Sequence, residues 1–134
     1  MKKGILIRTN GKVEPIDIDG LNGMQEAVGG LIECALTGDI NENEHWDLWA
    51  NDEGRLLELP MNQVARVFIA EMSDIPIEQV FSMHGDFLLL GHDGECACID
   101  CPESIADIAT NMAMFNEPTM TLQSEDGDKE VFFL

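Results

Sequence analysis

Three cysteines, Cys96, Cys98 and Cys101, lie close together in the sequence, and His92 precedes them by a few residues. Thiolates at such short spacings bind zinc, and His92 or His84 could complete a tetrahedral set of ligands. However, no second cysteine pair follows, and cysteine is one of the most frequently buried residue types. We therefore expect buried structural thiols, with no bound metal and no cofactor. A zinc site made of Cys96, Cys98, Cys101 and His92 is the weaker alternative.

No other group of residues is typical of an active site. His45, His84 and His92 are scattered along the chain, and no serine, cysteine or aspartate lies in a nucleophile motif such as G-x-S-x-G. Residues 126–130 offer oxygen ligands, but they lack the twelve-residue spacing of a calcium loop. We expect the three histidines to be surface or turn residues, and we expect the protein not to be an enzyme.

The charge of the chain limits its possible partners more than any motif does. The 134 residues include 26 acidic and 7 basic ones, which gives a net charge of −19. Proteins that bind phosphate backbones or anionic lipids need lysine and arginine, so direct binding to nucleic acids or to a membrane is disfavoured. The acidic residues alternate with apolar ones, which make up 45% of the chain, so the charge belongs to a folded surface.

Three explanations of this acidic surface remain open. It could provide solubility alone, it could attract a basic partner protein, or it could imitate the phosphates of a nucleic acid. The third explanation is geometrically possible because alternate side chains on one face of a strand lie about 7 Å apart. If a partner exists, we expect its contacts to include a group of acidic and aromatic residues: Glu42, Glu44, Asp47, Trp49, Asp52 and Glu53.

Trp49 is included because it lies three residues after Trp46 in an expected strand, so the two side chains should point to opposite faces. One of them should be in the core. The other could be exposed as an anchor for a partner, although both could also be partly buried.

The elements that must position these residues are short strands and helices. Asn-Gly, Asp-Gly and similar turn signals predict four hairpins, which pair residues 4–8 with 12–17, 45–50 with 55–57, 87–90 with 96–99, and 120–123 with 130–134. Pro15 predicts that its strand lies at a sheet edge. In the third hairpin we expect Leu89 opposite Cys98 and Leu90 opposite Ala97. A further strand is expected at 31–36, followed by a polar loop at 37–44.

Helices are expected in three places. One starts after Asp19 and ends at Gly29-Gly30, and another starts at residues 101–103 with Pro102 in its first turn. The clearest has an apolar stripe with helical spacing: Met61, Val64, Ala65, Phe68, Ile69 and Met72. Together these elements predict an α+β fold, in which a mostly antiparallel sheet of hairpins packs against two or three short helices. We expect one acidic domain over residues 1–134, located in the cytoplasm, with neither a signal peptide nor a membrane span.

Three segments carry a resemblance to a known family. Residues 25–33 read QEAVGGLIE, and residues 51–62 read NDEGRLLELPMN; a shorter segment, 85–91, reads GDFLLLG. With these segments, residues 3–92 resemble the domain of unknown function numbered three-eight-four-six, which is found mostly in phages, plasmids and other mobile elements. The resemblance leaves residues 93–134 as an extension made of a hairpin return, a helix and a C-terminal hairpin.

The resemblance brings no catalytic residues with it, but it implies a setting inside a bacterial cell. We therefore expect a small, non-enzymatic accessory protein of a phage or mobile element. It would bind a basic surface of a host or phage protein, with an inhibitor or a nucleic-acid mimic as the two forms that this binding could take. The alternative is a domain that binds or sequesters a small ligand. Its scarcity of arginine and lysine then disfavours anionic ligands.

Overall fold

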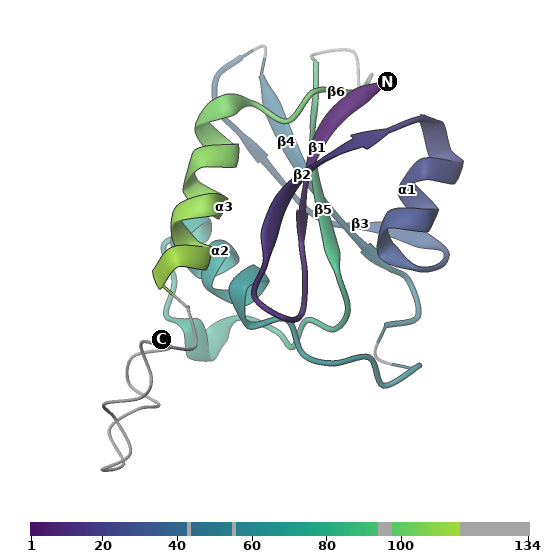
Figure 1. Ribbon diagram of the computed structural model, residues 1–134. Coiled ribbons are helices and arrows are strands. Elements are labelled where there is room, and N and C mark those ends of the chain that lie inside the picture. The colour runs from purple at the N-terminus through teal and green to yellow at the C-terminus, as the bar shows by residue number, and fades with distance from the viewer. Residues whose placement is uncertain (43, 55, 94–97, 116–134) are drawn as a thin grey trace.

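The computed structural model describes residues 1–42, 44–54, 56–93 and 98–115 of the chain (Figure 1). It contains one sheet, three α-helices and one turn of 3-10 helix. In chain order these elements are β1 (Lys2–Ile7), β2 (Val13–Ile18), α1 (Gly20–Val28), β3 (Ile32–Asp39), β4 (His45–Asn51), α2 (Gln63–Ser73), η1 (Ile77–Gln79), β5 (Phe87–His92), β6 (Cys98–Ile99) and α3 (Glu103–Phe115).

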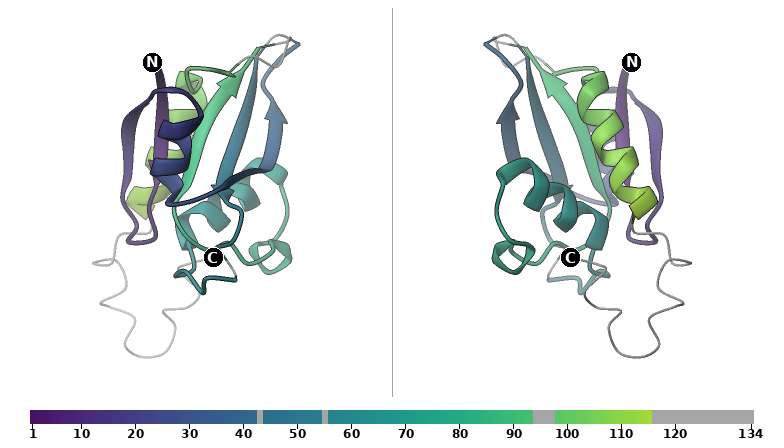
Figure 2. Two further views of the ribbon diagram at one scale, coloured as in Figure 1. Left: turned by 90° about the vertical axis from the view of Figure 1, so that its right-hand side faces the viewer. Right: turned by 90° about the vertical axis from the view of Figure 1, so that its left-hand side faces the viewer.

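The strands pair antiparallel in the order β2-β1-β5-β4-β3, and the short β6 pairs with the end of β5. The central strand, β5, is buried along almost its whole length. Helix α1 lies on one face of the sheet, while α3 lies on the other, as the two side views in Figure 2 show. The prediction of an α+β fold with a mostly antiparallel sheet is therefore confirmed.

The first hairpin forms as its turn residues predict. Gly11 has a positive φ of 93°, and the amide of Arg8 donates to the carbonyl of Lys12 at 2.8 Å. Strand β2, which contains Pro15, is at the edge of the sheet, as expected. Helix α1 also ends as predicted, because Gly29 adopts the left-handed conformation (φ 81°) and donates its amide to the carbonyl of Gln25.

Helix α2 and the face it covers hold most of the core. Phe68 is fully buried and packs edge-on against Trp46 of β4, with 5.4 Å between ring centroids. The predicted helix stripe is confirmed from Val64 onward. Met61 is an exception: it precedes the helix and is exposed, because Asn62 caps α2 by accepting a hydrogen bond from the amide of Ala65.

The face covered by α1 has a smaller core. Its buried residues are Ile18, Met24, Val28, Leu88 and Leu90, with Trp49 packed against them. Trp46 and Trp49 thus point to opposite faces, as predicted, and Trp46 is the one fully in the core.

The predicted second hairpin is wrong. Residues 52–54 and 56–58 form turns rather than a strand that pairs with β4. Strand β4 pairs instead with β3 and β5, which are formed by segments far from that turn. Strand β3 also runs on to Asp39, so the first residues of the predicted loop 37–44 belong to the strand.

The register of the third hairpin is also wrong. His92 lies opposite Cys98 and Gly91 opposite Ile99, so Leu89 does not face Cys98. This register does not match the two-residue Asp-Gly turn that the sequence predicts. Ala97, Cys96 and the predicted hairpin at 120–134 lie outside the described residues. Within the described ranges, no helix is long and apolar enough to cross a membrane.

Candidate functional site

The acidic residues expected to contact a partner do not form one patch. Glu42 and Glu44 are exposed before β4, whereas Asp52 and Glu53 are exposed after it. Because a strand rises about 3.3 Å per residue, the seven residues of β4 separate the two groups by about 20 Å. The structure therefore places them at opposite ends of the sheet.

The remaining two expected contact residues are not available as free contacts. Asp47 is only 7% exposed, and its carboxylate pairs with Nδ1 of His92 at 2.9 Å. Trp49 is half-buried against the α1 cluster. Asp47 and Trp49 therefore both make contacts within the fold.

The histidines of this end of the sheet form a stacked pair. His45 and His92 are cross-strand neighbours, with ring centroids 4.6 Å apart and an angle of 11° between the rings. His45 pairs with Asp39 through Nδ1 at 2.6 Å, in the same way that His92 pairs with Asp47. Each imidazole is thus held by a carboxylate, and the two His–Asp pairs join β3, β4 and β5 at this end of the sheet.

The cysteines do not converge on a metal site in the described part of the chain, where no group of three His, Cys, Asp or Glu side chains could hold an ion. Burial raises the pKa of the Cys101 thiol to about 12, which opposes the thiolate form that zinc requires. Cys101 packs against the core on the α2 side, while Cys98 lies opposite His92. Cys96, the third member of the expected set, is outside the described residues.

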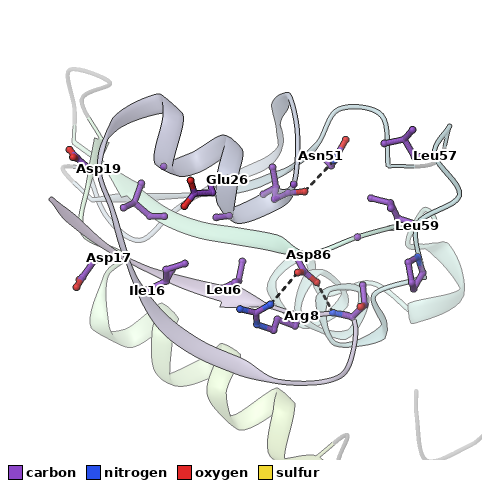
Figure 3. Close-up of a pocket in the computed structure, with 18 residues that line it drawn as sticks. Leu6, Arg8, Ile16, Asp17, Asp19, Glu26, Asn51, Leu57, Leu59 and Asp86 are labelled. Atoms are coloured by element: carbon purple, nitrogen blue, oxygen red, sulfur yellow. Dashed lines mark hydrogen bonds and ion pairs between the residues drawn. The ribbon is translucent and has the colours of Figure 1, made fainter.

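A pocket of about 570 Å³ lies on the α1 face, between α1, the β1–β2 hairpin and the segment 57–60 (Figure 3). Leu6, Ile16 and Ile18 provide apolar walls from the hairpin. Leu57 and Leu59 close the opposite end, as Figure 3 shows. This volume is in the range of pockets that hold small ligands or a few side chains.

The wall of the pocket is held together by the first two segments that carry the family resemblance. Asn51 joins them: its Nδ2 donates to the carbonyl of Val28 at 3.2 Å, and its Oδ1 accepts from the amide of Glu53 at 2.8 Å. Gly30 has no side chain here because an added Cβ would lie 2.9 Å from Nδ2 of Asn51. The end of α1 and the turn after β4 are therefore fixed against each other.

The third segment brings charge to the pocket. Asp86 accepts a hydrogen bond from the amide of Thr9 at 2.9 Å and pairs with Nη1 of Arg8 at 3.6 Å. Arg8 also pairs through Nε with Glu14 at 2.6 Å, and the two carboxylates raise the pKa of its guanidinium, with Glu14 as the main cause. Arg8 is thus already neutralised from two sides.

The other charged residues at the pocket are all acidic. Glu26 lies on α1, across the pocket from Arg8 and Asp86, and Asp17 and Asp19 border it where β2 leads into α1 (Figure 3). Glu26, Asp86 and Asp19 outnumber the one paired guanidinium and give the site a negative potential, while the Asp17 side chain points away from the pocket (Figure 3). The pocket can therefore accept a cation with an apolar stem, and it disfavours phosphates.

Reasoning from residue types missed this site. Arg8, Glu26 and Asp86 come from distant parts of the chain, and none of them lies in a recognised catalytic or ligand motif. One signal could have found it: all three segments that carry the resemblance contribute residues to the pocket, such as Glu26, Asn51 and Asp86.

Comparisons with known proteins identify a family. No curated protein and no solved structure was found to match the chain. A family match, however, covers residues 1–114, so it extends beyond residue 92 to include β6 and nearly all of α3. Because this match spans most of the 134 residues, the chain belongs to the family described as domain of unknown function DUF3846.

Proposed function

We propose that this protein is a non-enzymatic accessory protein of a phage or mobile element that binds a basic segment of a partner protein in the host cytoplasm. In this proposal, the partner inserts a lysine or arginine side chain into the pocket between α1 and the β1–β2 hairpin. The partner is a host or phage protein. The basic surface of this partner ordinarily binds a polyanion. The acidic surface of the present protein would take the place of that polyanion.

One observation carries the proposal: the charged lining of the pocket is acidic except for Arg8, which already has two carboxylate partners. The aliphatic stem of a lysine or arginine would pack against Leu6 and Ile16. Its cationic end would reach Glu26 and Asp86, and a charge-assisted hydrogen bond to a carboxylate is stronger than a neutral one.

The charge of the whole chain supports the same conclusion. A net charge of −19 attracts a basic partner from a distance and accelerates its association, but the effect is screened by salt. The same charge repels nucleic acid, so a polyanion is excluded as the direct ligand.

The test measures binding of labelled octalysine, with octaglutamate as the negative probe. We compare the wild-type chain with a pocket double variant, Glu26→Gln with Asp86→Asn. The matched control is Glu71→Gln with Glu78→Gln, which removes the same charge from exposed positions on α2 and η1. Asparagine at 86 keeps an oxygen that can accept from Thr9, so the fold should be retained.

We expect the pocket variant to lose about tenfold in affinity, or about 1.4 kcal/mol, and the control variant to lose less than about twofold. Binding should also weaken strongly at about 1 M salt, where the Debye length is about 3 Å. Equal losses in the two variants would mean that only net charge matters and would contradict a role for the pocket. Absence of octalysine binding at low salt would reject the proposal as a whole.

The pocket volume supports a second candidate function, which is the binding of a small organic cation. Spermidine is a suitable probe, with adenosine monophosphate as the anionic comparison. A ligand that binds only the folded state raises the melting temperature. If spermidine stabilises the wild-type chain but not the pocket variant, and octalysine does not compete with it, the small-ligand function replaces the first proposal.

A further inference from the structure

The two edges of the sheet differ in their ability to accept another strand. Strand β2 has six residues, and Pro15 at its centre has no amide to donate. Strand β3 at the other edge has eight residues and contains neither proline nor lysine, the two residue types that commonly block an edge. Among the described residues, only β4 pairs with β3.

Strand β3 has one irregularity, a register shift between Cys34 and Leu36. On either side of it the pairing with β4 is regular, over Ile32–Cys34 and over Leu36–Asp39. The edge therefore offers two short regular segments to a partner strand.

A second pocket of about 450 Å³ adjoins the first of these segments, on the α2 face. Glu33 and Ala35 of β3 line it, together with Ala50, Met83 and Phe87 from the neighbouring strands and the segment before β5. Two large apolar side chains at this pocket are exposed to solvent: Leu56 is 78% exposed and Phe81 is 51% exposed. Such residues beside an open strand edge are typical of a peptide-binding groove.

Among the described residues that line this second pocket, two are acidic and none is a lysine or an arginine. Glu33 and Asp52 both line this pocket, and the interaction between their carboxyl groups, together with burial, raises the pKa of Glu33. A lysine or arginine placed between them would replace a carboxyl–carboxyl contact with two ion pairs.

We propose that β3 binds an extended basic segment of a partner as an added antiparallel strand, with an apolar side chain in the pocket beside Leu56 and Phe81 and a cationic one between Glu33 and Asp52. This inference rests on the proposed function for the basic character of the partner, but it concerns a separate surface. The main-chain hydrogen bonds of β3 would supply affinity. The second pocket, beside Leu56 and Phe81, would supply selectivity for alternating apolar and basic residues.

Pairing of β3 with a second copy of the chain in the central register is disfavoured. In a symmetric antiparallel pair of β3 strands centred on Leu36, Glu33 would lie opposite Asp39 of the other copy, and like charges opposite each other are destabilising. The C-terminal residues 116–134 have the same difficulty, because they contain five acidic residues and one lysine. Charge complementarity therefore selects a basic partner.

The experiment uses the full chain and two eight-residue probes of equal charge. In one probe lysine alternates with valine, and in the other lysine alternates with proline and cannot form a strand ladder. Amide hydrogen exchange is followed in β3, in β2 and around the α1 pocket. We compare the wild-type chain, a groove variant (Leu56→Ser with Phe81→Ser) and the pocket variant Glu26→Gln with Asp86→Asn.

We expect the lysine–valine probe to slow exchange in β3 by about fivefold or more while leaving β2 unchanged, because only β3 gains hydrogen bonds. The lysine–proline probe should not slow it. The groove variant should bind the lysine–valine probe about fivefold more weakly, since both mutated side chains are exposed and their loss should leave the fold intact.

Two results would overturn the inference. The first is binding of the lysine–valine probe without slower amide exchange in β3. If the variant Glu26→Gln with Asp86→Asn also binds this probe more weakly, the proposed function of the α1 pocket is kept and the β3 edge is rejected as a binding surface. The other is protection of β3 in the free chain, which would mean that a second copy or residues 116–134 already cover it. Conversely, slower exchange in β3 with no effect of the pocket variant would support this inference and reject the pocket as the site.

Discussion

The two faces of the sheet differ in how completely helices cover them. Among the described residues, the α2/α3 face buries fifteen apolar residues in one cluster, whereas the α1 face buries five. Helix α1 has nine residues and is about 13 Å long, while five strands span about 20 Å, so one such helix cannot cover its face. The uncovered part is the acidic pocket. We infer that the α2/α3 face provides stability and leaves the α1 face free to bind.

The largest expected effect compares one large core side chain on each face. Phe68→Ala should lower the free energy of unfolding by about 3–5 kcal/mol, because the cavity lies in a closed core against Trp46. Met24→Ala on α1 should cost about 2 kcal/mol, since the half-covered face can adjust and admit water. Urea unfolding followed by circular dichroism measures both. Equal losses of unfolding free energy in the two variants would contradict the inferred difference in packing between the two faces.

The next comparison uses two buried asparagines. Nδ2 of Asn62 donates to the carbonyls of Ile7 and Gly85, and its Oδ1 caps α2. Asn62→Ala should therefore cost about 2–4 kcal/mol, because these groups stay buried without partners. Asn51→Ala should cost only about 1–2 kcal/mol, because the groups it leaves are next to the pocket and can reach water.

The two asparagines should also differ in binding. Asn51→Ala loosens the contact between α1 and the turn after β4, so its affinity for octalysine should fall more than that of Asn62→Ala. Measurements at a temperature where both variants remain folded separate the two effects. If Asn62→Ala weakens octalysine binding more than Asn51→Ala does, the contact between α1 and the turn after β4 does not determine the shape of the pocket.

These residues also show what the sequence could predict. The period of Val64, Ala65 and Phe68 fixes the inner face of α2, and Gly29 fixes the end of α1, because each depends on local geometry. The partners of β4 could not be predicted in the same way. The turn signal at residues 51–54 is compatible with a hairpin, and only the non-local pairing with β3 and β5 decides against it.

The pocket was even less accessible to sequence reasoning. Arg8, Glu26 and Asp86 are far apart in the chain, and their proximity depends on α1 packing back over β4 and β5. Asp47 shows the opposite case: its charge suggested an exposed contact, but it is buried and pairs with His92, which lies diagonally across from it on β5. Local sequence patterns predict most of the helices and strands, whereas the pocket depends on how these elements pack against each other.

A pair of glycines should change stability in opposite directions. Gly38 lies against the Trp46 indole, which an added methyl group would overlap, so Gly38→Ala should cost about 1–3 kcal/mol. Gly23 lies within α1, where an added Cβ would be 3.5 Å from Ile18, an ordinary contact. Gly23→Ala should therefore stabilise the protein by about 0.5–1 kcal/mol through higher helix propensity. Thermal unfolding measures both, and destabilisation by Gly23→Ala would show that the α1 face is more tightly packed than we infer.

The smallest expected effect concerns two thiols. Cys101 packs against the core on the α2/α3 face and burial raises its pKa to about 12, whereas Cys34 is exposed on β3. Iodoacetamide reacts with the thiolate, so Cys34 should be alkylated first near pH 8, as peptide mass spectrometry would show. Because the pKa of Cys101 is higher in the folded state than in the unfolded state, its contribution to stability is complete below about pH 9 and is lost as the pH rises towards 12. Cys101→Ser should remove this part of the loss of stability at alkaline pH. If Cys101 reacts as fast as Cys34 in the folded chain, the α2/α3 face opens more readily than its buried core implies.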